Sequence, residues 1–155
     1  MVTLFAKDNP NVVSIFILKK IFIPLYMSED KLQAEIYKQI NHLFPITRGL
    51  FYAVPNGGYR NKAEAIKLIA TGLLPGVADL ILDIPNNQFH GLKLELKLKG
   101  KTQSPNQIKY QENVTKHGYL YTVAFTLSQA IQIVANYLNL PVPPIDPELS
   151  IFDEY

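Results

Sequence analysis

The chain has 155 residues, 48% of them hydrophobic, and a formal net charge of +2. A chain of this length and composition folds as one domain with its own core, and so small a net charge does not by itself demand a nucleic-acid partner. The absence of cysteine excludes disulfides, thiolate nucleophiles and zinc–thiolate sites, and it agrees with a reducing cytoplasm.

The first 27 residues contain an apolar run, residues 12–26, that Lys19 and Lys20 interrupt. Each side of the lysine pair is too short to cross a bilayer, and the run lacks the basic start and small-residue cleavage site of a secretory signal. We therefore expect no membrane partner. Residues 1–27 are an N-terminal extension of uncertain role with three open interpretations. The apolar runs could form one or two added strands or a patch buried in a dimer, or Met27 could be the natural start, with residues 1–26 outside the working protein.

Helices and strands are expected to alternate over residues 28–139, the predicted domain. Ser28 has the side chain of a helix N-cap, and apolar residues then recur every three or four positions to Leu43. Further elements are expected at residues 50–54 (strand), 62–71 (helix), 80–84 and 92–99 (strands), 105–116 (helix), 119–125 (strand) and 128–138 (helix). This order predicts an α/β fold with a central mixed β-sheet flanked by helices. The Pro-rich tail, residues 140–155, is expected to be extended or loosely docked.

Leucines and charged residues alternate strictly along the expected strand 92–99. Because strand side chains alternate between faces, Glu95 and Lys97 share one face and the leucines bury the other. A hairpin centred near Gln88 would make paired positions sum to about 176, so that Ile81 lies opposite Glu95. The same register sets Asp79 opposite Lys97, and all three polar side chains converge on one face.

Two carboxylates brought this close repel each other unless a cation lies between them. Oxygen ligands of this kind suit Mg²⁺, which can polarise a scissile phosphate and lower the pKa of a bound water. Lys97 can orient that water or offset the charge that develops on the phosphate. The alternative interpretation is a solvated strand face with a Lys–Glu ladder, which supports cross-strand pairs alone.

Gln107 also has two interpretations. The stretch from Ser104 to Gln107 has the spacing of a capping box, with proline at the first helical position. A side chain in the first helical turn can also face the mouth of the adjacent strand. The two roles do not exclude each other.

The Asn56-Gly57-Gly58 turn is either a plain connection or a loop whose glycines allow the backbone to approach a phosphate. Arg60 and Lys62 lie on this loop. Lys93, Lys99 and Lys101 lie on or beside the proposed active face. Basic residues in such places neutralise phosphates and position a duplex without reading its sequence.

Taken together, these segments resemble the virus-type replication-repair nuclease (VRR-NUC) family of the PD-(D/E)XK superfamily, over about residues 28–138. The matching segments are residues 55–60, 72–80, 95–97 and 104–107. Ala78 departs from the family, in which proline or serine is common at this place. The resemblance implies a restriction-endonuclease-like core.

The resemblance also implies metal-dependent DNA cleavage, with Mg²⁺, or Mn²⁺ in its place, as the cofactor. It assigns Asp79 and Glu95 as metal ligands, Lys97 as the catalytic lysine and Gln107 as the family's helix-borne glutamine. Glu35 matches an acidic residue of the family's first helix and is a third expected ligand, although a pairing with Lys31 explains it equally well. The asparagine–glycine turn, with Arg60, is the expected DNA contact.

The preferred hypothesis is therefore an intracellular, metal-dependent endonuclease that acts on branched or flapped DNA. The preference for branched DNA and an expected homodimer come from the resemblance alone. A non-catalytic nucleic-acid-binding module with the same fold is the alternative, although such a module has no use for converging carboxylates that repel DNA. RNA cleavage is a third hypothesis, since no residue pattern here selects for or against a 2′-hydroxyl.

Overall fold

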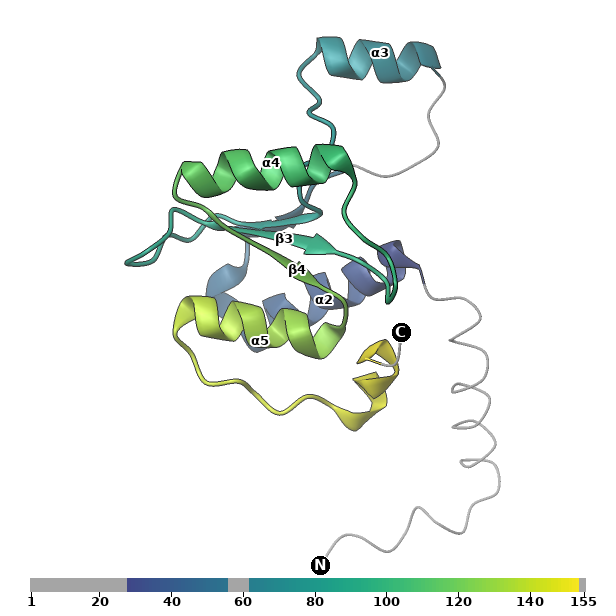
Figure 1. Cartoon of the computed structure of the whole chain (residues 1–155). Helices are drawn as coiled ribbons and strands as arrows, with labels where there is room; N and C mark the ends of the chain where they lie inside the picture. The colour runs from purple at the N-terminus through teal and green to yellow at the C-terminus, as the bar shows by residue number, and fades with distance from the viewer. Residues whose placement is uncertain (1–27, 56–61, 154–155) are drawn as a thin grey trace, which may run out of the picture.

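The computed structural model describes residues 28–55 and 62–153, and its centre is a four-stranded sheet (Figure 1). The strands lie in the order β1 (Phe51–Ala53), β2 (Leu80–Leu82), β3 (Leu92–Leu96) and β4 (Leu120–Ala124). The strands β1, β2 and β3 pair antiparallel, whereas β4 runs parallel to β3. A parallel pair needs a long crossover, and the helix α4 (Pro105–Lys116) supplies it.

Helices cover both faces of this sheet. The helices α2 (Glu29–Leu43) and α5 (Leu127–Leu138) pack on one face, and α4 packs on the other (Figure 1). The leucines of β3 are fully buried against α2 and α5, as the alternation predicts. The expected α/β class, with a mixed sheet flanked by helices, is confirmed.

Local signals fix the ends of the helices within one or two residues of the expected positions. The Ser28 hydroxyl accepts from the backbone N–H of Lys31, and Thr126 caps α5 in the same way through Gln129. A short 3₁₀ helix, η2 (Pro45–Thr47), follows α2. The strands are shorter than expected: β1 and β4 lack one residue at each end, whereas β2 and β3 start as expected and end two and three residues early.

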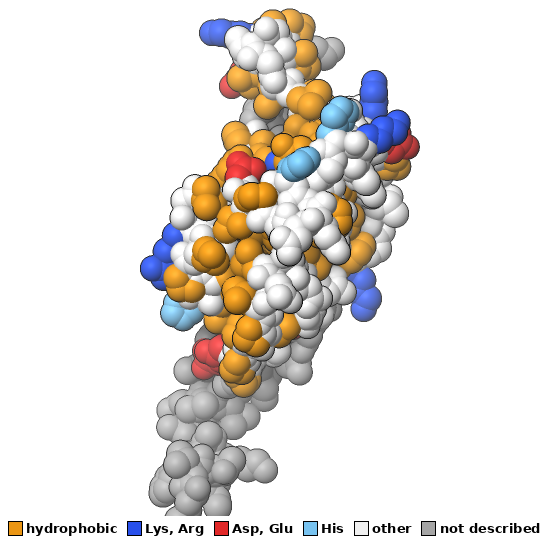
Figure 2. Space-filling view, turned by 90° about the vertical axis from the view of Figure 1, so that its left-hand side faces the viewer, with side chains coloured by type: hydrophobic (Ala, Val, Ile, Leu, Met, Phe, Trp, Pro, Cys, Tyr) orange, Lys and Arg blue, Asp and Glu red, His pale blue; other side chains and the backbone are white. Residues whose placement is uncertain are grey.

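The helix α3 (Lys62–Ala70) projects from the rest of the molecule (Figures 1 and 2). Gly72 ends it with a φ of 101°, a left-handed conformation that glycine adopts without strain. Ile66 and Ile69 are exposed by 68% and 54%, so α3 carries an apolar face that the described residues leave uncovered.

The C-terminal tail is only partly extended. Residues 140–146 form no regular element, but Pro147–Asp153 forms the 3₁₀ helix η3, which packs on α5. The Asp153 carboxylate accepts from the backbone N–H of Ser128 at 2.8 Å, and Phe152 packs against the core. The expectation of a loosely docked tail is wrong for this segment, because the Asp153 carboxylate and apolar side chains anchor it to α5.

The hairpin register differs from the expected one by two residues. Leu80 pairs with Leu94 and Ile81 with Lys93, so Ile81 does not lie opposite Glu95. The Asn86 carboxamide accepts from the backbone N–H groups of Gln88 and Phe89, which tightens the turn and moves its centre toward the N-terminus. A shift of two residues keeps every side chain on its predicted face.

Residues 1–27, with their three interpretations, lie outside the described residues. Within the part of the chain that the structure does describe, no helix is long and apolar enough to cross a membrane.

Candidate active site

Glu95 is the central residue of the site, on the face of β3 that α4 covers. Its side chain is 0% exposed. Burial raises the pKa of its carboxyl group, and the charge of Asp79 acts in the same direction, whereas a hydrogen bond from Lys97 opposes the shift. Because Glu95 is fully buried, this face is not the solvated strand surface of the alternative interpretation. A buried carboxylate is costly without specific partners, so its contacts matter.

Asp79 lies directly before β2 and is half-buried. Its Oδ2 accepts from the backbone N–H of Leu96 at 2.8 Å, and its own carbonyl accepts from Val54 N–H at 2.9 Å. Burial raises the pKa of the Asp79 carboxyl group, against the Leu96 hydrogen bond and the charge of Lys97. In the observed register Asp79 is thus held beside Glu95 and Leu96 rather than opposite Lys97.

Lys97 is 6% exposed, and its ammonium group lies among oxygen atoms. Nζ is 2.7 Å from Glu95 Oε1, donates to the Leu96 carbonyl at 2.7 Å and lies 3.6 Å from Glu29 Oε1. Burial alone would lower the pKa of Lys97, but the hydrogen bond and charge of Glu95, together with Glu29 and Asp79, raise it. This place therefore favours a positive charge.

A cleft of about 760 Å³ opens beside this ammonium group. The start of α2, the loop after β3 and the first turn of α4 form its walls. Its lining includes Glu29, Asp30, Lys97, Lys101, Gln103 and Gln107. A phosphate group can therefore reach the buried polar face from solvent at this point.

Gln107 caps α4 and also contacts Glu95, with different atoms of its amide. Its Oε1 accepts from the backbone N–H of Ser104 at 2.7 Å, and its own N–H donates to the Ser104 hydroxyl, which completes a capping box. Its Nε2 donates to Glu95 Oε1. The cap orients the amide so that its donor end meets the buried carboxylate.

Tyr121 is a site residue that the sequence patterns did not single out. Its hydroxyl donates to Glu95 Oε2 at 3.2 Å and accepts from Gln103 Nε2 at 3.2 Å. Gln103 Nε2 also donates to Gln111 Oε1 at 2.9 Å. Both oxygens of Glu95 are therefore held, one by Lys97 and Gln107 and the other by Tyr121. The register of β4 beside β3 brings Tyr121 here, and only the tertiary structure sets that register.

The acidic residue of α2 at the site is Glu29 rather than the expected Glu35. The Glu35 carboxylate accepts from Gln39 at 2.7 Å and lies 3.4 Å from Lys38 Nζ, both on its own helix. Six residues separate the two glutamates, which is about 9 Å along the helix axis. Glu29 directly follows the N-cap, and this position at the open end of the helix is the signal that could have identified it.

Lys93 does not lie on a DNA-contacting surface as expected. Its side chain is 10% exposed, 3.6 Å from Asp83 Oδ1, and its ammonium lies 4.6 Å above the centre of the Tyr119 ring. Burial lowers the pKa of Lys93, although Asp83 opposes the shift. The covering of this face by α4 and Tyr119 turns an apparent surface lysine into a packed one.

The structure places only some of the other residues that were expected to contact DNA. Lys99 and Lys101 are exposed, and Lys101 lines the cleft. Lys62 begins α3. Asn56, Gly57, Gly58 and Arg60 lie outside the described residues.

Metal coordination would rest on few protein ligands. Over residues 28–55 and 62–153, no three histidine or acidic side chains form a group that could hold a metal ion. Asp79 and Glu95 remain as a pair of carboxylates, with the Leu96 carbonyl and Glu29 close to the same ammonium. Mg²⁺ usually binds through one or two carboxylates and completes its shell with water and phosphate oxygens, so this donor set fits it.

Comparison with known proteins identifies the fold. A solved structure described as a VRR_NUC domain protein superposes with a TM-score of 0.62 and 26% sequence identity, covering 74% of this chain and 90% of that one. No protein-family model matches the sequence, and no curated protein matches it. The chain therefore has a VRR-NUC-like fold, as the sequence segments indicated, and it is a nuclease-like domain.

Proposed function

We propose that the protein is a metal-dependent DNA endonuclease that hydrolyses phosphodiester bonds. The observation that carries the proposal is the meeting of Asp79, Glu95, Lys97 and Gln107 beside an open cleft, within a VRR-NUC-like fold. Buried carboxylates of raised pKa next to a charged lysine are typical of functional sites.

Asp79 and Glu95 would hold the divalent cation, and Glu29 rather than Glu35 is the acidic residue of α2 placed to assist. A bound Mg²⁺ supplies Lewis-acid activation of the scissile phosphate and of a water molecule. Mn²⁺ would serve in the same place. The cation would also offset the repulsion between the two carboxylates, which otherwise raises the pKa of Glu95.

The protein's own residues orient the reacting groups. Lys97 carries a positive charge at the cleft and can donate to the attacking water or to a phosphate oxygen. Gln107 and Tyr121 hold the two oxygens of Glu95, so that this carboxylate needs little rearrangement during the reaction. Lys99 and Lys101 provide positive charge near the cleft for the DNA backbone.

The test compares variants in cleavage of labelled duplex, flap, single-stranded and four-way-junction DNA, with and without Mg²⁺. Asp79→Asn and Glu95→Gln should abolish cleavage yet bind DNA in EDTA as well as the wild type or more tightly, since each removes negative charge. Glu29→Gln should slow cleavage, and the matched control Glu35→Gln on the same helix should not. Full activity of Asp79→Asn would refute the site, and DNA binding without cleavage under any metal would favour a binding module. An RNA strand of the same sequence tests the third hypothesis.

We further propose that the protein forms a homodimer and prefers branched DNA. A two-fold dimer sets two active sites against two strands, which suits a symmetric junction. The exposed apolar face of α3, with Ile66 and Ile69, is surface of the kind that dimers bury. Sedimentation equilibrium should give twice the chain mass, and a monomer at micromolar concentration would contradict the dimer.

A further inference from the structure

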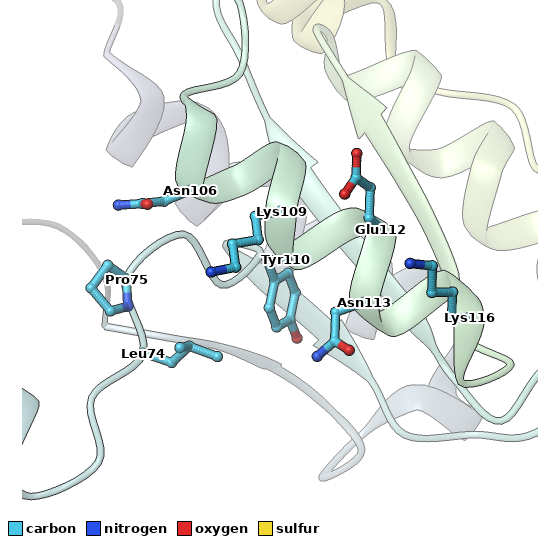
Figure 3. Close-up of a pocket in the computed structure, with 8 residues that line it drawn as sticks. All are labelled: Leu74, Pro75, Asn106, Lys109, Tyr110, Glu112, Asn113 and Lys116. Atoms are coloured by element: carbon cyan, nitrogen blue, oxygen red, sulfur yellow. The ribbon is translucent and has the colours of Figure 1, made fainter.

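A second cavity, of about 500 Å³, lies between α4 and the loop that follows α3 (Figure 3). It shares no lining residue with the catalytic cleft. Leu74 and Pro75 form one side, and Lys109, Tyr110 and Asn113 extend from α4 toward them. Its size falls within the range of about 300–1,000 Å³ that is common for ligand sites.

The loop wall of this cavity is fixed in place by Gly76. Gly76 has a φ of 87°, and a Cβ atom there would lie 2.5 Å from the backbone carbon of Asn106. The loop therefore packs directly on the first turn of α4, at a distance that only glycine permits. Leu74 and Pro75 are thus held opposite Tyr110.

The aromatic wall of the cavity is connected to the catalytic carboxylate. The Tyr110 ring meets the Tyr121 ring edge to face, with 6.2 Å between their centres. The Tyr121 hydroxyl donates to Glu95 Oε2 at 3.2 Å. One aromatic ring, that of Tyr121, thus separates the wall of the cavity from Glu95.

The lining has the chemistry of a nucleobase site. Leu74, Pro75 and the Tyr110 ring provide apolar walls against which a flat base can stack. Asn106 and Asn113 provide amide groups for the polar edge of a base, and Figure 3 shows both amides on the side of α4 that carries Lys109.

Two lysines at the same cavity are placed to bind the phosphate backbone of the DNA strand that would carry the base. Lys109 and Lys116 lie two helical turns apart on α4, and neither makes a salt bridge with another residue of the described ranges. These ammonium groups, which have no ion pair among the described residues, are available for phosphate oxygens, against the single carboxylate of Glu112 in the same lining.

We propose that this cavity takes one unpaired nucleobase of the DNA strand that enters the catalytic cleft. The inference rests on the proposed function for its DNA substrate, and it deepens that function by supplying a reason to prefer branched or flapped DNA. A base inside a duplex is stacked and paired, and its removal costs a few kcal/mol, whereas a base at a branch is already free.

The test uses flapped DNA with 2-aminopurine at one unpaired position per substrate, moved outward from the branch point, and wild-type protein in EDTA. Stacking on Tyr110 should quench the fluorescence at one or two positions only. Leu74→Ala, at a side chain 54% exposed, should reduce the quench without unfolding the protein. Tyr110→Leu should abolish it and weaken flap binding about tenfold, the scale of one lost base–aromatic stack. Binding of fully paired duplex should stay within about twofold.

The matched control is Ile108→Ala, at an apolar side chain of α4 that is 46% exposed and does not line the cavity. It should behave as the wild type. Equal quenching at all positions would overturn the proposal. A Leu74→Ala protein that quenches as strongly as the wild type and the Ile108→Ala control would also overturn it. Equal loss of flap and duplex binding in Lys109→Met would also overturn it, since the surface would then contact phosphates alone. A position-specific quench without cleavage under Mg²⁺ or Mn²⁺ would refute the nuclease and leave the base site standing.

Discussion

The double role of Gln107 leads to a prediction in which stability and catalysis separate. In Gln107→Glu, one carboxylate oxygen can still accept from Ser104 N–H, because glutamate serves a capping box as well as glutamine does. The donor to Glu95 is lost, however, and a second carboxylate takes its place beside a fully buried one. The variant therefore changes the site and leaves the cap of α4 intact.

The expected magnitude follows from these contacts. A hydrogen bond to a charged group contributes about 1.5–3 kcal/mol, and the new like-charge pair adds to its loss. The free energy of unfolding in EDTA should therefore fall by at least about 1.5 kcal/mol. An energy of that size in the transition state corresponds to about 10- to 100-fold slower cleavage. Because a cation between the carboxylates offsets their repulsion, Mg²⁺ should restore more stability to Gln107→Glu than to the wild type.

Ser104→Ala is the matched control, since it removes the other half of the same cap. It should cost about 1 kcal/mol of stability and change cleavage little, because Gln107 Nε2 keeps its contact with Glu95. Urea unfolding in EDTA and in Mg²⁺, with single-turnover cleavage at saturating enzyme, measures both quantities. A Gln107→Glu protein with wild-type stability and turnover would show that the Glu95 contact has no functional weight and that Gln107 is only a capping residue.

Three further predictions concern the neighbours of Glu95. Lys97→Met should slow single-turnover cleavage at least about 100-fold and also lower stability, because it leaves the buried Glu95 without its ion-pair partner. The control Lys99→Met, at an exposed lysine, should only weaken DNA binding, more visibly at higher salt. Equal, modest effects of the two substitutions on cleavage would show that Lys97 is not catalytic. Asp79 has a folded-state pKa above its ordinary 3.8, so the metal-free folded state holds this proton more tightly than the unfolded chain does, and stability falls as pH rises above about 4. Asp79→Asn should remove this residue's share of the decline in stability and raise the melting temperature in EDTA at pH 7. A lower melting temperature would contradict the raised pKa of Asp79. Tyr121→Phe removes a hydrogen bond that lowers the pKa of Glu95, so the acidic limb of the pH–rate profile should move to higher pH. A profile that keeps its position would show that Tyr121 has a packing role alone.

The sequence by itself determined the order and type of the elements. Ser28 and Ser104 are helix caps whose hydrogen bonds are local, so a few adjacent residues suffice to place the starts of α2 and α4. The alternation along β3 likewise assigned Glu95 to the face opposite the leucines. It did so even though the register was two residues off, because a shift of two preserves the face.

Only the tertiary structure decided how buried that polar face is and which residues meet on it. The position of α4 over the sheet buries Glu95, Lys93 and Lys97, which a strand pattern alone shows as charged and therefore exposed. The choice of Glu29 over Glu35 depends on where the end of α2 lies relative to β3. Tyr121 reaches Glu95 only through the parallel pairing of β3 and β4, between residues far apart in the chain. These contacts depend on how helices and strands pack in three dimensions, and that packing has no local signature in the sequence.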